Sequence, residues 1–146
     1  MSYLKFNHIS IITKDVSKHA ISFLESSIID QVGDIFIEEQ QGVRIKFGLD
    51  SSGILYEFIE PIDDESPISN ALNQGKNIIN HIGYSVSSLE KSLNLLSSKR
   101  AIPIGVPKPS KCFNEAHVQF VFTSSNVLIE LIETDCPETF SLISYR

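Results

Sequence analysis

Cysteine is scarce in this sequence: Cys112 and Cys136 are its only two, and their spacing matches no metal-binding cysteine motif. The sequence alone predicts no disulfide bond between them, so we expect two reduced thiols. The amino terminus has neither the basic segment nor the long apolar segment of a signal peptide. No stretch of about 18 apolar residues occurs, so no membrane-spanning helix is expected. We therefore expect a soluble protein of the cytoplasm.

Basic residues are also few, because 12 Lys and Arg stand against 18 Asp and Glu, which gives a net charge of −6. The sequence has no basic patch or tail, so nucleic acid is not an expected partner. A chain of 146 residues with 42% hydrophobic content is long enough for one ordinary core. We expect a single domain over residues 1–146.

The sequence does contain an internal repeat. Residues 79–86 repeat residues 6–13, residues 127–133 repeat residues 54–60, and a weaker echo links residues 117–120 to residues 44–47. Each offset is 73 positions (81 − 8 and 130 − 57), which is half of 146. One module is therefore written twice. Two such modules are expected to pair about a pseudo-twofold axis, which brings equivalent positions close together.

Local patterns predict one order of elements in both halves. In the first half we expect a strand over 4–13, a helix over 16–28 with Asp15 as its N-cap, and strands over 34–40, 43–49 and 54–60, with turns at 41–42 and 51–53. A short helix over 67–74, capped by Ser66 and ended by Gly75, is expected between the modules. In the second half we expect a strand over 79–86, a helix opened by a capping box over 87–90, a proline-rich irregular loop over 103–113, and strands over 116–123 and 126–133.

These elements predict an α+β fold of two tandem βαβββ modules. Module one covers residues 1–61, a structured connector covers 62–76, and module two covers 77–146. A single helix in each module can cover only one face of the sheet. The other face of a curved mixed sheet is then free to enclose a cleft.

Each half carries one histidine and one glutamate in apolar strands, separated by 49 positions (57 − 8 and 130 − 81). Alone, a strand histidine is usually a hydrogen-bonded structural group, and a strand glutamate usually faces solvent. Glu130 is different, because apolar neighbours surround it and a buried carboxylate needs a cation. The repetition therefore predicts one shared site for His8, Glu57, His81 and Glu130. Such a mixed nitrogen and oxygen site is compatible with Zn, Ni, Co, Mn or Fe(II).

Glu60 and Glu133 repeat at the same offset. Their side chains have the opposite parity to Glu57 and Glu130, which places them on the other face of the sheet. We interpret them as solvated strand ends.

The chain resembles the vicinal oxygen chelate superfamily, which includes glyoxalase I, methylmalonyl-CoA epimerase, extradiol dioxygenases and bleomycin-resistance proteins. The resemblance covers nearly the whole chain and is closest to the epimerase and glyoxalase I-like branch. Its most specific part is Glu60-Pro61 followed by Glu65-Ser66-Pro67-Ile68. The matching segments are Asn7-His8-Ile9, Gln41-Gly42-Val43, Asn80-His81-Ile82-Gly83 and Val127-Leu128-Ile129-Glu130-Leu131.

The resemblance implies that His8, Glu57, His81 and Glu130 hold one divalent metal ion, such as Zn, Ni, Co or Mn. It also implies an epimerase, isomerase or lyase that abstracts a proton beside a carbonyl and forms a metal-stabilised enediolate. Either Glu57 or Glu130 could serve as the catalytic base. The sequence predicts no second carboxylate base near Ile45.

The expected ligand is a small molecule, either an acyl-CoA or a glutathione adduct, although no clamp for either conjugate can be located in the sequence. A non-catalytic binding protein of the bleomycin-resistance type is the main alternative. An Fe(II) dioxygenase is less favoured, because such a site needs two histidines and only one carboxylate. Sheet edges that pair between chains predict a homodimer.

Overall fold

Eight strands form one mixed sheet in this computed structural model, which describes residues 4–74 and 79–135. The strands are β1 (Leu4–Ile12), β2 (Gln31–Glu38), β3 (Val43–Leu49), β4 (Leu55–Pro61), β5 (Ile79–Val86), β6 (Ile102–Ser110), β7 (Ala116–Phe122) and β8 (Leu128–Glu133). The helices are α1 (Val16–Glu25), α2 (Ser69–Asn73), α3 (Leu89–Ser98) and the 3₁₀ turn η1 (Lys111–Phe113). Gly75 and Cys136, which carried predictions, lie outside the described residues.

The strand order β2-β3-β4-β1-β5-β8-β7-β6 is the same in both halves when each half is followed outward from the centre. In each module the first strand pairs in parallel with the last, as β1 does with β4 and β5 with β8. The register repeats too, because Ser10 faces Glu57 as Gly83 faces Glu130. The α+β fold of two βαβββ modules, joined by the antiparallel pair of β1 and β5, is confirmed.

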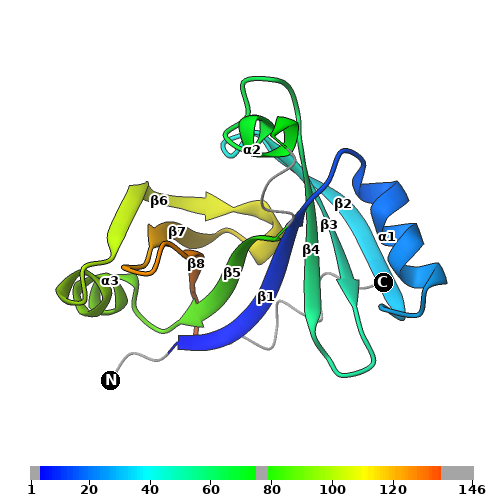
Figure 1. The fold of residues 1–146 in the computed structure, drawn as a ribbon. Helices are drawn as coiled ribbons and strands as arrows, with labels where there is room; N and C mark the ends of the chain where they lie inside the picture. The colour runs from blue at the N-terminus through cyan, green and yellow to red at the C-terminus, as the bar shows by residue number, and fades with distance from the viewer. Residues whose placement is uncertain (1–3, 75–78, 136–146) are drawn as a thin grey trace.

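The sheet curls so that its two halves face each other, with β1 and β5 at the centre of the curve (Figure 1). Helix α1 packs on β3 and β4, and α3 packs on β6 and β8, so each helix supports one module. Between the halves lies an apolar core that joins residues of β3 and β4 to residues of β7 and β8. One face of the sheet therefore carries the helices, and the other encloses the centre of the molecule.

The two helices bury equivalent positions. Val16 and Ala20 of α1 pack with Phe58, and Leu89 of α3 packs with Leu131, which lies 73 positions beyond Phe58. Burying a side chain of this size stabilises the fold by about 1.5–3 kcal/mol. Helix α1 ends at Glu25, earlier than predicted, because Ser27 takes a left-handed conformation (φ 59°) and turns the chain.

Glu133 is exposed at the end of β8, as predicted, whereas Glu60 is half-buried, and the interpretation missed that both carboxylates contact a helix N-terminus. Oε2 of Glu133 accepts a hydrogen bond from the Leu89 backbone N–H at 2.8 Å, and Oε1 of Glu60 accepts one from Val16 at 3.4 Å. A carboxylate at a helix N-terminus satisfies an otherwise unpaired donor and favours the helix dipole. Each glutamate thus ties the last strand of its module to the helix of that module.

The side-chain caps were predicted with mixed success. Asp15 accepts from Lys18 N as expected, but in the second module the N-cap is Ser88, which accepts from Lys91 N. The predicted capping box began one residue too early, since Ser88 is the residue equivalent to Asp15 at the 73-residue offset. Helix α2 begins at Ser69 with Ile68 as its cap residue, so Ser66 is not its N-cap.

The predicted loop over 103–113 is instead an edge strand, β6, followed by η1. Pro103 faces Val121 and Pro109 faces His117 across the pair with β7. An edge strand tolerates proline because one side of its backbone has no neighbouring strand to bond. A register shift between Ile104 and Lys108, at Gly105 with φ +68°, absorbs the irregularity.

The longest helices within residues 4–74 and 79–135 have 10 residues, so none of them can cross a bilayer.

Replacing Glu133 by Ala should lower the free energy of unfolding by about 1 kcal/mol, because the Leu89 N–H loses its acceptor. Urea denaturation followed by circular dichroism measures this change. Glu39→Ala, in an exposed turn, is the matched control and should unfold at the wild-type midpoint. Equal midpoints for the two variants would contradict the role of Glu133 as a cap.

Candidate metal centre

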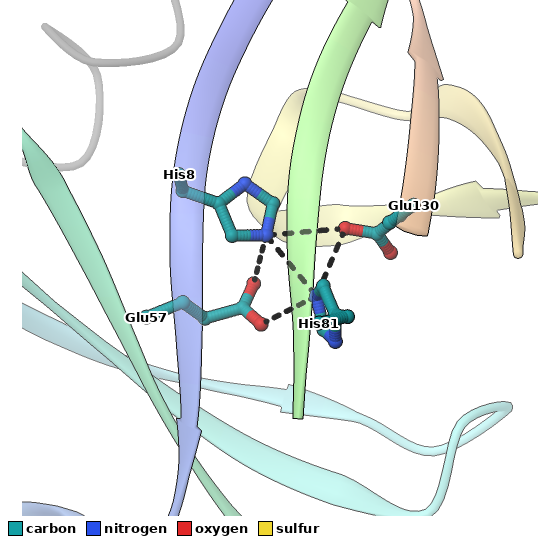
Figure 2. Close-up of side chains that lie close together, drawn as sticks. All are labelled: His8, Glu57, His81 and Glu130. Carbon is teal, nitrogen blue, oxygen red and sulfur yellow. Dashed lines mark hydrogen bonds and ion pairs between the residues drawn. The ribbon is translucent and has the colours of Figure 1, made fainter. Parts of the chain in front are cut away.

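Four side chains from four adjacent strands meet at the centre of the curled sheet (Figure 2). They are His8 on β1, Glu57 on β4, His81 on β5 and Glu130 on β8, and each exposes at most 3% of its surface. One nitrogen or oxygen atom from each lies within 4.8 Å of the others. The structure therefore brings together all four residues that the repeat singled out.

The pairing registers of the strands explain why the four side chains lie together. In the central pair, His8 lies opposite Gly83 and Ser10 lies opposite His81. In the flanking parallel pairs, Glu57 lies beside Ser10 and Glu130 beside Gly83. Equivalent residues of the two modules thus reach the same depth from either side of the pseudo-twofold axis.

Both imidazole rings are oriented by the asparagine that precedes them in the chain. His8 Nδ1 lies 2.8 Å from Asn7 Oδ1, and His81 Nδ1 lies 2.6 Å from Asn80 Oδ1. An amide oxygen can only accept, so each Nδ1 carries the hydrogen and each neutral ring presents a lone pair on Nε2. Donation from Asn7 Nδ2 to Ser85 Oγ at 3.3 Å supports this orientation of the first amide.

The distances inside the cluster fit a shared cation. The two Nε2 atoms are 3.2 Å apart, and each lies between 3.4 and 3.6 Å from oxygens of both carboxylates. Ligand atoms bound at about 2.1 Å with angles of 90–109° lie roughly 3.0–3.4 Å apart. Oε1 of Glu130 is also buried without a hydrogen-bond partner. This set of inward-facing acceptors is suited to a divalent metal ion.

The surroundings of His8 and His81 shift their pKa values in opposite directions. Burial lowers the pKa of His8 to about 4, which the nearby Glu57 carboxylate does not offset. Burial would also lower the pKa of His81, but the adjacent Glu130 and Glu57 carboxylates outweigh it and raise that pKa to about 9. A positive charge between the two carboxylates is therefore strongly favoured.

The glutamates are not equivalent either. Burial opposes ionisation of Glu57, yet His8, His81 and the Ser10 hydroxyl, which donates to Oε1 at 2.9 Å, lower its pKa to about 2. Burial raises the pKa of Glu130, and His81 offsets this only in part. Where module one has Ser10, module two has Gly83, which offers no hydroxyl. The repeat is therefore asymmetric at the position that stabilises the carboxylate.

A cavity of about 420 Å³ opens beside the cluster. Glu57, His81 and Asn80 reach it from the cluster, and Gln40, Gln41 and Lys108 are its other polar side chains among the described residues. Its remaining lining, apart from Gly105, is apolar: Val43, Ile59, Pro67, Ile68, Ile104, Val106, Val118, Phe120, Phe122 and Leu128. A ligand in this cavity would contact two of the four clustered side chains.

Sequence reasoning missed Glu38, a third buried carboxylate near the site. It lies beside Val43 in the pair of β2 and β3, and its Oε1 accepts from Ser110 Oγ at 2.8 Å and Cys112 N at 2.9 Å. It thereby links the ends of the outermost strands, β2 and β6, across the curled sheet. Nothing in its local pattern marked it, since it has no counterpart at the 73-residue offset.

Asn7 and Asn80 were visible in the repeat, but their orienting role needed the rings in place.

Comparison with known proteins agrees with this fold. Residues 7–122 match the family model described as Glyoxalase/Bleomycin resistance protein/Dioxygenase superfamily. No curated protein sequence matches the chain. Its structure is also similar to many solved structures. The sequence identities of the examples below are under 25%, so this similarity shows a shared fold and no more.

Three of these structures illustrate the likeness. Methylmalonyl-CoA epimerase from Mycobacterium tuberculosis shares 20% identity over 88% of this chain and 87% of its own, with a TM-score of 0.76. A variant of the Streptomyces coelicolor epimerase, in complex with 2-nitronate-propionyl-CoA, shares 18% over 91% and 99%, also at 0.76. A hypothetical protein of Bacillus halodurans C-125 shares 24% over 90% and 95%, at 0.78.

Replacing Gly83 by Ala should push the His8 ring out of the cluster, because an added Cβ would overlap the imidazole. We expect a loss of about 1–3 kcal/mol in stability and of the nuclear Overhauser effects between the His8 and His81 rings. Gly53→Ala is the control, since it adds a methyl group in strained backbone with open space around it. Retention of the ring-to-ring effects in Gly83→Ala would show that the contact does not position His8.

Proposed function

We propose a function from the premise that this chain belongs to the glyoxalase, bleomycin resistance protein and dioxygenase superfamily, whose model matches residues 7–122. The protein is a divalent-metal-dependent epimerase, isomerase or lyase that removes a proton from a carbon beside a carbonyl group. One observation carries this proposal: two imidazole lone pairs and two carboxylates converge in a buried space, beside a cavity of ligand size.

His8, Glu57, His81 and Glu130 would hold the metal. Two nitrogen and two oxygen donors suit Zn, Ni, Co or Mn. A bound ion would supply Lewis-acid stabilisation for the negative charge that develops on the carbonyl oxygen of the substrate. Asn7 and Asn80 keep both rings in the tautomer that binds a cation, in the way that outer hydrogen bonds orient metal-binding histidines in general.

Glu130 is the proposed base, and because it does not itself line the cavity, the reacting carbon would have to pass the lining formed by Glu57 and His81 to reach it. Glu57 lines the cavity, but Ser10 and the histidines already stabilise its anion, which makes it the weaker proton acceptor. Burial raises the pKa of Glu130, which also lacks the hydroxyl donor that Ser10 gives to Glu57, so this carboxylate has more to gain by accepting a proton. In this scheme Glu57 would serve only to hold the metal, while Glu130 would take up the proton from the substrate carbon and later return it.

The apolar lining of the cavity supports this chemistry because it limits water around the reacting carbon. Val118 and Ile59 are buried beside the cluster, and Phe120 packs edge-on against the His81 ring at 5.0 Å between centroids. Electrostatic interactions are stronger in such surroundings than in water.

The substrate is proposed only by class. Similar structures include methylmalonyl-CoA epimerases, one of them holding an acyl-CoA analogue, and this supports an acyl-CoA thioester. A glutathione adduct is the other conjugate to test, given the glyoxalase branch of the superfamily. A dioxygenase is disfavoured, since a two-histidine, one-carboxylate iron site would leave no role for the second glutamate.

A non-catalytic binding protein of the bleomycin-resistance type is the second candidate. It is favoured by the mainly apolar lining of the cavity, which can retain a ligand without any chemistry. Metal content and proton exchange separate the two candidates.

We also propose a cytoplasmic homodimer. The outer strand β2 exposes Ile35 and Ile37 at 47% and 48%, as a strand covered by a second chain would. Light scattering at micromolar concentration should give twice 16.3 kDa. A mass that stays at 16.3 kDa up to a hundred micromolar would contradict the dimer.

Protein purified without chelator should contain one divalent ion per chain by plasma mass spectrometry. Glu130→Gln and His81→Ala should each weaken metal binding at least tenfold while far-ultraviolet circular dichroism stays unchanged, because the apolar neighbours of these residues are retained. Glu133→Gln is the matched control on the same strand and should bind metal as the wild type does.

The same proteins test catalysis by proton exchange in deuterated water, with methylmalonyl-CoA, a glutathione hemithioacetal and aliphatic 2-oxo acids as substrates. At saturating metal, Glu130→Gln should lower the exchange rate by about 10²–10⁴-fold, the usual contribution of a positioned base. Metal binding without exchange in any substrate would favour the binding protein. Wild-type metal affinity in both site variants would place the metal site elsewhere.

A further inference from the structure

The cavity beside the metal centre has two different ends. Its inner end carries Glu57 and His81, which are buried at 2% and 3% exposure. Its outer walls carry apolar side chains, among them Ile104 and Phe122, each 41% exposed. Covering such side chains with an apolar ligand is favourable, whereas a polar ligand body would gain nothing from them.

The charges of the residues that line the cavity restrict the class of ligand further. Among the described residues, Lys108 is the one cation that lines the cavity. Recognition of several phosphate groups requires several Arg or Lys side chains or helix N-termini, and the lining provides neither. The net charge of −6 also disfavours a polyanion. A volume of about 420 Å³ lies in the lower part of the roughly 300–1,000 Å³ range of small-molecule pockets, which favours a ligand smaller than a nucleotide conjugate.

The outer wall is a fixed part of the structure. The register shift of β6 brings Ile104, Gly105 and Lys108 to the cavity. Gln119, which is 2% exposed, donates from its amide nitrogen to the carbonyl oxygens of Ile104 and Gly105. These bonds hold the irregular backbone in place at Ile104 and Gly105, so Ile104 occupies a defined position.

We infer that the substrate is a small carbonyl compound with an aliphatic or aromatic body, which lies along the apolar walls and ends in at most one anionic group, opposite Lys108. This inference rests on the proposed function, because the oxygens of the compound are placed at the metal centre. It keeps the reaction class but disfavours the acyl-CoA thioester that the similar structures suggest and the larger glutathione adduct, because the described lining offers a single Lys and limited space.

Linear alkyl hydroxamates, whose two oxygens chelate metals, test the inference by calorimetry on the metal-loaded protein. Affinity should rise about fourfold for each methylene between acetohydroxamate and hexanohydroxamate. Ile104→Asn should flatten this rise. Ile102→Asn, on the same strand but outside the cavity lining, is the control and should preserve it.

The charge is tested with an eight-carbon hydroxamate that ends in a carboxylate, compared with octanohydroxamate. Lys108→Met should weaken only the carboxylate-bearing probe, by about fivefold, whereas Lys111→Met, outside the lining, should weaken neither. Free coenzyme A should not displace octanohydroxamate.

A chain-length series without a rise, or displacement by coenzyme A, would overturn the inference. Acetohydroxamate that still binds in that case leaves the metal centre, and with it the proposed function, intact. Metal content is measured on the same samples, so a protein that retains no metal overturns the proposed function and the inference together.

Discussion

The Nε2 atoms of His8 and His81 lie 3.2 Å apart at the buried centre of the molecule, and the surrounding structure holds them in this position. The central pair of β1 and β5 sets their separation, and the asparagines before them turn the lone pairs inward. Such an arrangement is repulsive unless positive charge lies between the rings. The two carboxylates on the flanking strands define where that charge belongs.

The two modules share a backbone plan but differ at the residues beside the clustered carboxylates. The serine opposite His81 and the glycine opposite His8 occupy equivalent places. The serine stabilises one carboxylate, while the glycine makes room for a ring and leaves the other carboxylate without a hydroxyl donor. A perfectly symmetric pair of modules would give two carboxylates of equal basicity, whereas here the pKa of Glu57 is lowered and that of Glu130 is raised.

The fold and the four clustered residues could be predicted because both depend on the 73-residue repeat, which preserves strand order and side-chain parity. The structural features that were not predicted depend on contacts with distant parts of the chain. The prolines of β6 indicate a loop unless the strand is known to be an edge, and the hydrogen bond from Leu89 to the exposed Glu133 cannot be foreseen unless the start of α3 is known to lie beside it. Glu38 has no counterpart in the repeat, and its partners come from the opposite edge of the sheet.

The prolines of β6 have an effect beyond the cavity. Pro103, Pro107 and Pro109 remove three backbone donors from one outer strand of the sheet, whereas β2, the other outer strand, contains no proline. A further strand needs those donors to continue the sheet. The two edges of the sheet therefore differ. A further strand, added in assembly or in aggregation, can pair with β2 but not with β6, the strand that forms a wall of the cavity.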